Sequence, residues 1–223
     1  IITGRNQEKL NAAKKLYPAL IAIKSDVANA DDAQLLFNKV KEFGGIDILY
    51  NNAGVMSSPL NLGVANTKHF EAAENEININ YLGVIRLNNI FIEMLKSRKE
   101  CAIINTTSIL SYVPLTLAPT YSATKAALHF YTQALRNHLQ VLHSNLKVFE
   151  LLPPVVATVM AEGLDTKAIS PEQLVKALIA GIRKDRFTIR VGTTKLIYLI
   201  SRLSPKLAFN LVNPAKNARL LQS

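Results

Sequence analysis

Short apolar runs alternate with longer segments of helical period along most of this chain. The mostly apolar runs are residues 1–4, 19–25, 46–50, 101–107, 146–152 and 187–191. Runs of this length indicate strands that are buried on both faces, as in a parallel sheet. Segments between them place apolar residues three or four positions apart, which indicates helices packed on that sheet. The pattern predicts a single three-layer α/β domain with a Rossmann-type, doubly wound, mostly parallel sheet.

The first apolar run lacks the glycine-rich turn that opens a dinucleotide-binding domain. It ends in Thr3-Gly4, but residues 6–9 carry no glycine. We interpret it as the second strand of the sheet and expect the first strand, its turn and its helix to be missing from this chain. In the doubly wound order that strand lies between the second and the fourth. We therefore expect a gap there, lined with unpaired backbone groups.

The end of the chain differs in composition from the rest. Residues 186–223 contain seven Lys or Arg and no Asp or Glu, within a chain of net charge +10. Leucine and isoleucine recur near helical spacing there, at Leu196, Leu199, Ile200, Leu203, Leu207 and Leu211. We predict a Rossmann-type domain over 1–192 and a basic amphipathic helical extension over 193–223. Such a helix can lie on an anionic membrane, cover a substrate pocket or pack on a second subunit.

Composition narrows the class of protein. The chain has 223 residues, 49% of them hydrophobic and 19% charged, which suits one globular domain. Its single cysteine, Cys101, excludes a disulfide framework, and together with the lack of a signal peptide or membrane-length apolar run it predicts a cytoplasmic protein. Cysteine, histidine and acidic residues are not spaced as metal ligands, so we expect no metal site. No recognition motif for nucleic acid accompanies the basic residues.

One segment carries residues suited to acid–base chemistry. Tyr121 and Lys125 are four positions apart in a predicted helix, so their side chains share one face. A free tyrosine has a pKa of about 10, and a neighbouring ammonium lowers it. Ser108, at the end of the preceding strand, would hold a substrate oxygen beside the phenol. On these three residues alone, an ordinary amphipathic helix face is an equally good interpretation.

Four further motifs favour the catalytic interpretation. They are Asp26-Val27, Asn51-Asn52-Ala53-Gly54, the Asn80 segment Ile77-Asn78-Ile79-Asn80, and Pro153 to Thr158. With Ser108, Tyr121 and Lys125 they resemble the short-chain dehydrogenase/reductase family over roughly residues 1 to 190. The tail resembles the DltE-like members of that family in bacteria. The resemblance implies hydride transfer between a nicotinamide cofactor and a carbonyl or secondary alcohol, catalysed by Ser108, Tyr121, Lys125 and Asn80, with Asn80 holding a water of a proton relay.

The resemblance also implies which residues bind the cofactor. Arg5 follows the second strand, where an arginine suits the 2′-phosphate of NADP(H) and an acid would suit NAD(H). The other expected cofactor-binding residues are Asp26, Val27, Asn52, Ala53, Gly54, Tyr121, Lys125, Pro153, Val156 and Thr158. Pro154 stands where the family usually has glycine. Residues 159–170 are expected to form a lid over the substrate.

The sequence also indicates the kind of substrate, the assembly and an alternative function. Leu110, Val113, Leu115 and Leu117 in the loop after Ser108 predict a fairly apolar small-molecule substrate. The resemblance implies a homo-oligomer. Because the glycine-rich turn is missing, the chain could instead be a non-catalytic interaction or membrane-associated fragment of such an enzyme.

Overall fold

The computed structural model describes residues 1–158, 168–215, 217 and 220–221. Its strands are β1 (Ile2–Gly4), β2 (Ala22–Lys24), β3 (Ile48–Asn51), β4 (Ala102–Thr106), β5 (Lys147–Leu152) and β6 (Thr188–Arg190). Its α-helices are α1 (Gln7–Leu16), α2 (Ala30–Glu42), α3 (Thr67–Ile77), α4 (Gly83–Lys96), α5 (Pro119–Val141), α6 (Pro171–Ile182), α7 (Thr194–Leu203) and α8 (Pro205–Val212). Strands and helices alternate along the chain, as predicted.

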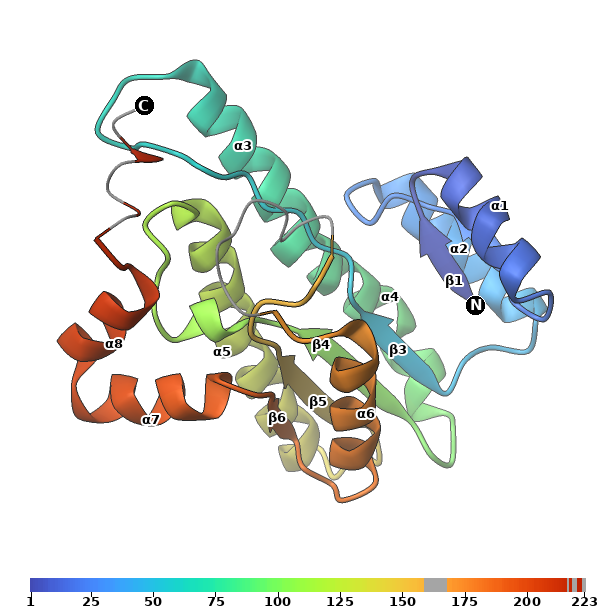
Figure 1. Cartoon of the computed structure of the whole chain (residues 1–223). Helices are drawn as coiled ribbons and strands as arrows, with labels where there is room; N and C mark the ends of the chain where they lie inside the picture. The colour runs from blue at the N-terminus through green and yellow to red at the C-terminus, as the bar shows by residue number, and fades with distance from the viewer. Residues whose placement is uncertain (159–167, 216, 218–219, 222–223) are drawn as a thin grey trace.

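The strands form two separate parallel sheets. The larger sheet has the order β3-β4-β5-β6, and β1 pairs with β2 in the other. No ladder joins β1 to β3, and Figure 1 shows the β1, α1 and α2 lobe set apart from the edge of the four-stranded sheet. Ile48 and Tyr50 of β3 are exposed at this edge. The predicted α/β fold class is confirmed.

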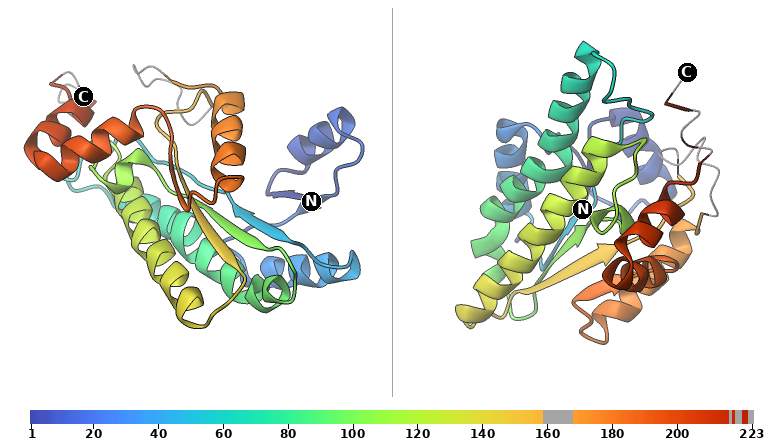
Figure 2. Two further views of the ribbon diagram at one scale, coloured as in Figure 1. Left: turned by 90° about the horizontal axis from the view of Figure 1, so that it is seen from below. Right: turned by 90° about the vertical axis from the view of Figure 1, so that its left-hand side faces the viewer.

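Helices cover the two faces of the larger sheet unequally. On one face Leu49, Ile103 and Val148 pack with Phe91 of α4 and Leu139 of α5. On the other, Ile104 and Leu151 pack with Leu178 of α6. Figure 2 shows α4 and α5 side by side beneath the sheet and α6 above it. The N-terminal lobe joins the first cluster through Ala33, Leu36 and Val40 of α2.

Two helices and a short turn between them connect β3 to β4. Between α3 and α4 lies a π-helical turn, η1 (Asn78–Leu82), which contains Asn80. A π-turn inserts a residue into the helix and changes the direction of its side chains, and such turns occur often at functional sites. Here the turn directs Asn80 into the interior, where it is fully buried.

The extension over 193–223 does not form the one helix that its periodicity suggested. It forms α7 and α8, which meet at Ser204 and Pro205. Proline cannot donate in a helix interior but suits the first turn, and the Ser204 hydroxyl accepts from the Leu207 N–H. These two residues therefore start a new helix. No described helix is both long and apolar enough to cross a bilayer.

Candidate active site

Helix α5 brings Tyr121 and Lys125 to the carboxyl end of β4. Pro119 occupies its first turn, where the missing N–H costs nothing. Lys125 is buried, and its Nζ donates to the carbonyl of Thr106 at 2.8 Å. The same Nζ lies 5.6 Å from the centre of the Tyr121 ring. The predicted one-face arrangement of these two side chains is therefore present.

Ser108 completes the group from the loop that follows β4. Its side chain lies near the Tyr121 phenol and acts to lower the pKa of that phenol. Its Oγ also accepts from the Leu110 N–H at 3.1 Å, in the short 3-10 turn η2 (Ile109–Ser111). Ser111 Oγ donates to the Lys125 carbonyl at 2.9 Å, which ties this turn to α5. The structure thus joins Ser108, Tyr121 and Lys125 in one site.

The protonation of the pair differs from expectation. Burial raises the pKa of Tyr121 to about 12, although the Ser108 side chain acts to lower it. Burial also lowers the pKa of Lys125 to about 8. The sequence led us to expect that the lysine would lower the tyrosine pKa. In the structure desolvation outweighs any such effect, because both charged forms lose water in the interior.

Asn80 and Gly54 adjoin this pair. The Asn80 amide forms two bonds with Val55, accepting its N–H at 2.8 Å and donating to its carbonyl at 2.9 Å. It also donates to Thr124 Oγ1 at 3.1 Å. A Cβ on Gly54 would lie 3.4 Å from Asn80 Oδ1 and 3.6 Å from Lys125 Nζ. Gly54 therefore lies between the two side chains, and the Asn80 amide contacts backbone rather than the lysine.

A buried amide network behind the site was not predicted. Asn51 Nδ2 donates to Asn88 Oδ1 and to Asn105 Oδ1, each at 2.8 Å. Asn105 Nδ2 donates to Thr132 Oγ1 at 3.0 Å. The four residues come from β3, α4, β4 and α5, and together they fix the strands whose ends carry the site. The available signal was an asparagine within each of two apolar strands, since a buried amide requires partners.

The N-terminal lobe carries three of the expected cofactor-binding residues, Arg5, Asp26 and Val27. Arg5 Nη1 is 3.9 Å from Asp26 Oδ2. Asp26 Oδ1 accepts the Ala28 N–H, whereas the N-cap of α2 is Asn29. Val27 lies against Gly83 of α4, where an added Cβ would come within 2.9 Å of its side chain. Arg86 donates to the Val27 carbonyl, which attaches the lobe to α4.

The remaining candidates follow β3 and β5. Asn52 Oδ1 accepts weakly from Thr106 Oγ1 at 3.4 Å, and Ala53 connects it to Gly54. The Pro153 carbonyl accepts the Ile109 N–H at 3.0 Å, which places it next to the Ser108 turn. Val156 pairs with Ile169, and Thr158 is exposed. Most of the predicted lid, residues 159–167, lies outside the described residues.

These positions fit a nicotinamide cofactor at one end of the site. Gly54 leaves room beside Lys125, and an added Cβ would fill part of that room. The exposed cation of Arg5 follows a strand whose carboxyl end faces the same way as those of β3 and β4. Ligands of doubly wound sheets bind beyond this edge.

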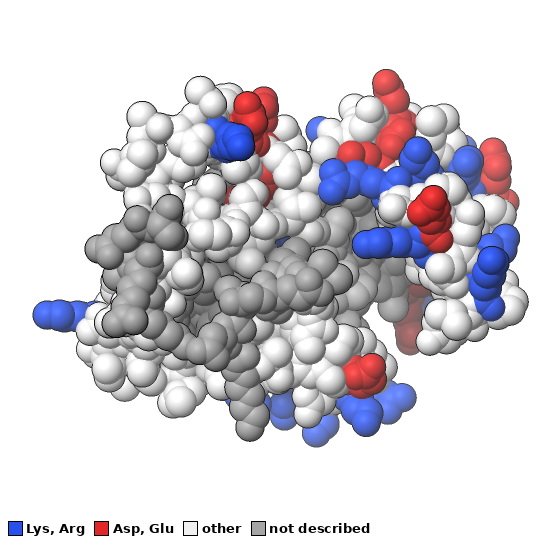
Figure 3. Space-filling view, turned by 45° about the horizontal axis from the view of Figure 1, so that its top comes forward, with Lys and Arg blue, Asp and Glu red and all other residues white. Residues whose placement is uncertain are grey.

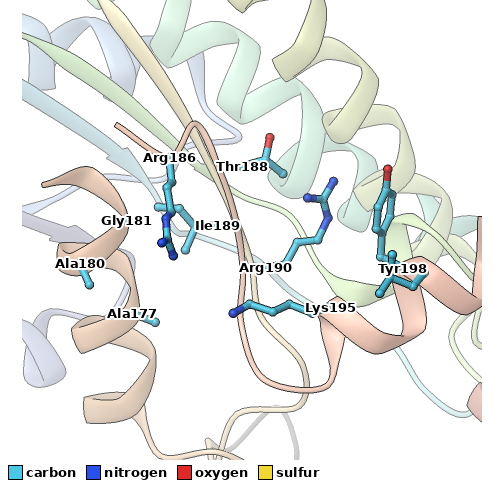
Figure 4. Close-up of a pocket in the computed structure, with 10 residues that line it drawn as sticks. Ala177, Ala180, Gly181, Arg186, Thr188, Ile189, Arg190, Lys195 and Tyr198 are labelled. Atoms are coloured by element: carbon cyan, nitrogen blue, oxygen red, sulfur yellow. The ribbon is translucent and has the colours of Figure 1, made fainter. Parts of the chain in front are cut away.

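A separate hollow lies away from these residues. It has a volume of about 400 Å³ and is lined by α6, β6 and α7. Figure 4 shows Ala177 and Gly181 of α6 facing Lys195 and Tyr198 of α7 across it. Arg190 bonds to Tyr112 Oη at 3.0 Å and lies 3.8 Å from the Tyr198 ring centre. None of the predicted catalytic residues lines it, so volume alone does not locate the active site.

The apolar loop after Ser108 is only partly available to a substrate. Val113 and Leu117 are each 3% exposed. Val113 packs with Ile197 of α7 and Ala208 of α8. Both side chains are therefore core residues, and Val113 holds the C-terminal helices, while Leu110 and Leu115 remain partly exposed.

Comparison with known proteins identifies the family to which this chain is similar. The short chain dehydrogenase family matches residues 1–168. "Uncharacterized oxidoreductase DltE" of Bacillus subtilis is 31% identical over 194 residues, which cover 83% of this chain and 75% of that protein. An uncharacterized oxidoreductase of Staphylococcus epidermidis is 29% identical, covering 80% of this chain and 77% of its own length.

Solved structures give the same result. A short chain dehydrogenase from Burkholderia cenocepacia, in complex with NADP, has a TM-score of 0.80 and 26% identity, covering 98% of this chain and 84% of that one. A short chain dehydrogenase/reductase from Burkholderia phymatum, in complex with NAD, has a TM-score of 0.75 and shares the fold at 20% identity, covering 90% and 84%.

Proposed function

This chain belongs to the short chain dehydrogenase family, and we propose that it serves NADP(H)-dependent hydride transfer between nicotinamide and a carbonyl or secondary alcohol. The family match and the similarity to DltE support an oxidoreductase of this family. The observation that carries the finer proposal is the contact of Tyr121 with both Ser108 and Lys125 at one buried site.

The proposed chemistry divides the work among these side chains. A bound nicotinamide cofactor would supply the hydride that the carbonyl carbon accepts. Tyr121 donates its phenolic proton to the carbonyl oxygen, and Ser108 donates a hydrogen bond to the same oxygen as its charge develops. The high pKa of free Tyr121, about 12, keeps the proton on the phenol at neutral pH. The site therefore rests in the form needed for reduction.

Lys125 and Asn80 have supporting roles in this proposal. Burial lowers the pKa of Lys125 to about 8, so this lysine can exchange a proton near neutral pH. It would hold the nicotinamide ribose and stabilise the phenolate that forms on Tyr121. Asn80 fixes Val55 beside Gly54. A water held between Asn80 and Lys125, passing protons to solvent, stays part of the proposal.

We also propose a preference for NADP(H), an apolar substrate, a homo-oligomer and a cytoplasmic location. Arg5 supports NADP(H), since its side chain is 56% exposed and its guanidinium can bind a phosphate. Leu110 and Leu115 support an apolar substrate. Exposed Phe70 on α3 and Phe130 on α5 support a homo-oligomer through these helices. The free, buried thiol of Cys101 supports a cytoplasmic location.

Replacing Tyr121 by Phe tests the central proposal. We expect Tyr121→Phe to lower kcat for carbonyl reduction by about 10²–10⁴-fold, because the proton donor is lost. NADPH affinity, followed by nicotinamide fluorescence, should change little. Tyr131→Phe, on the same helix, is the matched control and should retain activity. Near-normal turnover by Tyr121→Phe would exclude it as the acid.

The C-terminal helices favour a second candidate function, contact with an anionic membrane. Leu196, Leu199 and Leu203 of α7 are exposed, near the hollow lined by Arg186, Arg190 and Lys195. Among the described residues, none of these three cations has an ion-pair partner. Exposed leucines beside unpaired cations suit insertion among anionic headgroups.

Vesicle sedimentation tests the proposed contact with an anionic membrane. We expect the chain to bind vesicles that contain phosphatidylserine and not vesicles of phosphatidylcholine alone. Leu203→Asp should abolish that binding, whereas Leu35→Asp, at an exposed leucine of α2, should not. Failure of the unmodified chain to bind anionic vesicles would reject membrane contact and leave the enzyme proposal unaffected.

A further inference from the structure

A fully buried carboxyl group lies next to the tyrosine site and has no role in the chemistry above. Glu76, in the last turn of α3, has no exposed surface. Its Oε1 accepts the Ser57 N–H at 2.5 Å. Its Oε2 is buried without a hydrogen-bond partner among the described residues. A carboxylate in such a place is costly, so the neutral acid is the favoured form.

Glu76 and Asn80 hold one loop together. They are four residues apart, one on the last turn of α3 and one on η1. Asn80 accepts the N–H of Val55, and Glu76 accepts the N–H of Ser57. The loop that starts at Gly54 is thus bound at two alternate residues, as a neighbouring strand would bind it. Gly54 itself lies 3.6 Å from Lys125 Nζ, measured from its ideal Cβ position.

The charge on Glu76 acts on Tyr121. After burial, which is the largest cause, a negative Glu76 contributes to the raised pKa of Tyr121. Burial raises the pKa of Glu76 as well. On α5, the titratable groups near the site are Tyr121 and Lys125. The loop of residues 52–66 carries none, and Tyr81 of η1 packs its ring on Tyr131.

We propose that Glu76 is a positioning residue of the tyrosine site, which fixes the Gly54–Ser57 loop through Oε1 and retains a proton on Oε2 so that no carboxylate faces Tyr121. This inference rests on the proposed role of Tyr121 as the proton donor. When Tyr121 gives its proton to a carbonyl oxygen, a neutral Glu76 leaves the new phenolate without an anionic neighbour. Ionisation of Glu76 makes the same step less favourable.

Glu76→Gln separates charge from hydrogen bonding. Glutamine still accepts the Ser57 N–H but cannot become negative. As the pH rises, Glu76 ionises before Tyr121 does, so the unmodified protein has a carboxylate beside the phenol when Tyr121 titrates. Glu76→Gln has none, and we expect its Tyr121 phenolate to form at a lower pH, by roughly one unit. The phenolate is followed by its ultraviolet absorbance in cofactor-free protein. The same titration in a Tyr121→Phe background identifies the contribution of Tyr121.

The matched control is Glu74→Gln, an exposed carboxyl on the same helix, which should not move the titration. In carbonyl reduction, the alkaline loss of kcat should shift to lower pH in Glu76→Gln by the same amount. An unchanged Tyr121 titration in Glu76→Gln, or an equal shift in Glu74→Gln, overturns the proposal. Because the titration needs no turnover, a failed role of Tyr121 in catalysis is recognised separately.

A second measurement applies if Glu76→Gln does not fold. Infrared spectra of the unmodified protein should then show a carboxylic-acid carbonyl band that persists at neutral pH, where exposed carboxyls are ionised. Glu150 is also fully buried with an unpartnered oxygen, so it could give the same band. The spectrum of Glu150→Gln shows whether the band comes from Glu150 or from Glu76. If no band persists, or if Glu150→Gln removes it entirely, the neutral Glu76 is rejected.

Discussion

The N-terminal lobe and the four-stranded half of the molecule present their functional groups in opposite ways. In the lobe, the exposed Arg5 pairs with the half-buried Asp26 at 3.9 Å. In the larger half, Lys125 and Asn80 are buried and their hydrogen bonds are 2.8 to 3.1 Å long. Figure 3 shows charged side chains of both signs crowded over the lobe, while the visible face of the larger half is mostly uncharged.

This difference separates two tasks. Proton transfer requires donors held in place before the substrate arrives, and burial among fixed hydrogen bonds provides that order. Selection of a phosphate-bearing cofactor needs a cation that stays charged and reachable, which an exposed arginine provides. We infer that substitutions in the larger half alter folding and protonation, whereas those in the lobe alter cofactor choice.

Asn105→Ala should have the largest effect on stability. It removes the acceptor of one Asn51 bond and the donor to Thr132, inside a fully buried network. We expect the free energy of unfolding to fall by about 2–4 kcal/mol, because buried polar groups lose their partners. Denaturant titration measures this. Asn38→Ala, at an exposed asparagine of α2, should cost less than about 0.5 kcal/mol. Equal losses in both variants would mean that the network does not hold the strands.

Stability should change with pH in two steps, the first caused by Lys125 and the second, at higher pH, by Tyr121. The pKa of Lys125 is about 8 when folded, below its unfolded value, so the folded protein releases this proton first and stability rises with pH above about 8. The gain should be at most about 3 kcal/mol. The pKa of Tyr121 is about 12 when folded, above its unfolded value, so stability falls from about pH 10 upward.

Urea titrations of cofactor-free protein across this range provide the measurement. Lys125→Met should lack the rise above about pH 8 and keep the later fall. Tyr121→Phe should keep the rise and weaken the fall. If Lys125→Met retains the full rise, another group is responsible and the buried lysine does not have the depressed pKa.

Arg5→Ala should affect cofactor choice while leaving stability nearly unchanged. Its side chain is exposed in the pair with Asp26, so we expect a change in unfolding free energy of no more than about 0.5 kcal/mol. NADPH should bind about tenfold more weakly, because one charge-assisted contact to the phosphate is lost. NADH affinity should stay the same. Lys9→Ala, another exposed cation of the lobe, is the control, and equal losses for NADPH and NADH would remove Arg5 from phosphate recognition.

Local patterns were sufficient for much of the fold and for part of the site. Apolar runs predicted the six strands of the described residues. The physical reason is clearest for β4 and β5, which are buried on both faces and are therefore almost entirely apolar. The spacing of Tyr121 and Lys125 predicted their shared face, which depends only on helix geometry. Membership of the short-chain dehydrogenase family, implied by the combined motifs, is confirmed by the family match.

Tertiary structure decided what depends on residues far apart in the chain. The Asn51–Asn105–Thr132 network, the burial of Glu76 beside Ser57 and the packing of Val113 beneath α7 all join separate elements. The raised pKa of Tyr121 belongs with them, because desolvation depends on everything that excludes water around the phenol. Residue types and spacing alone determined which groups can exchange protons in this protein. Only the assembled fold determined at what pH they do so, since that depends on the surroundings each group has once buried.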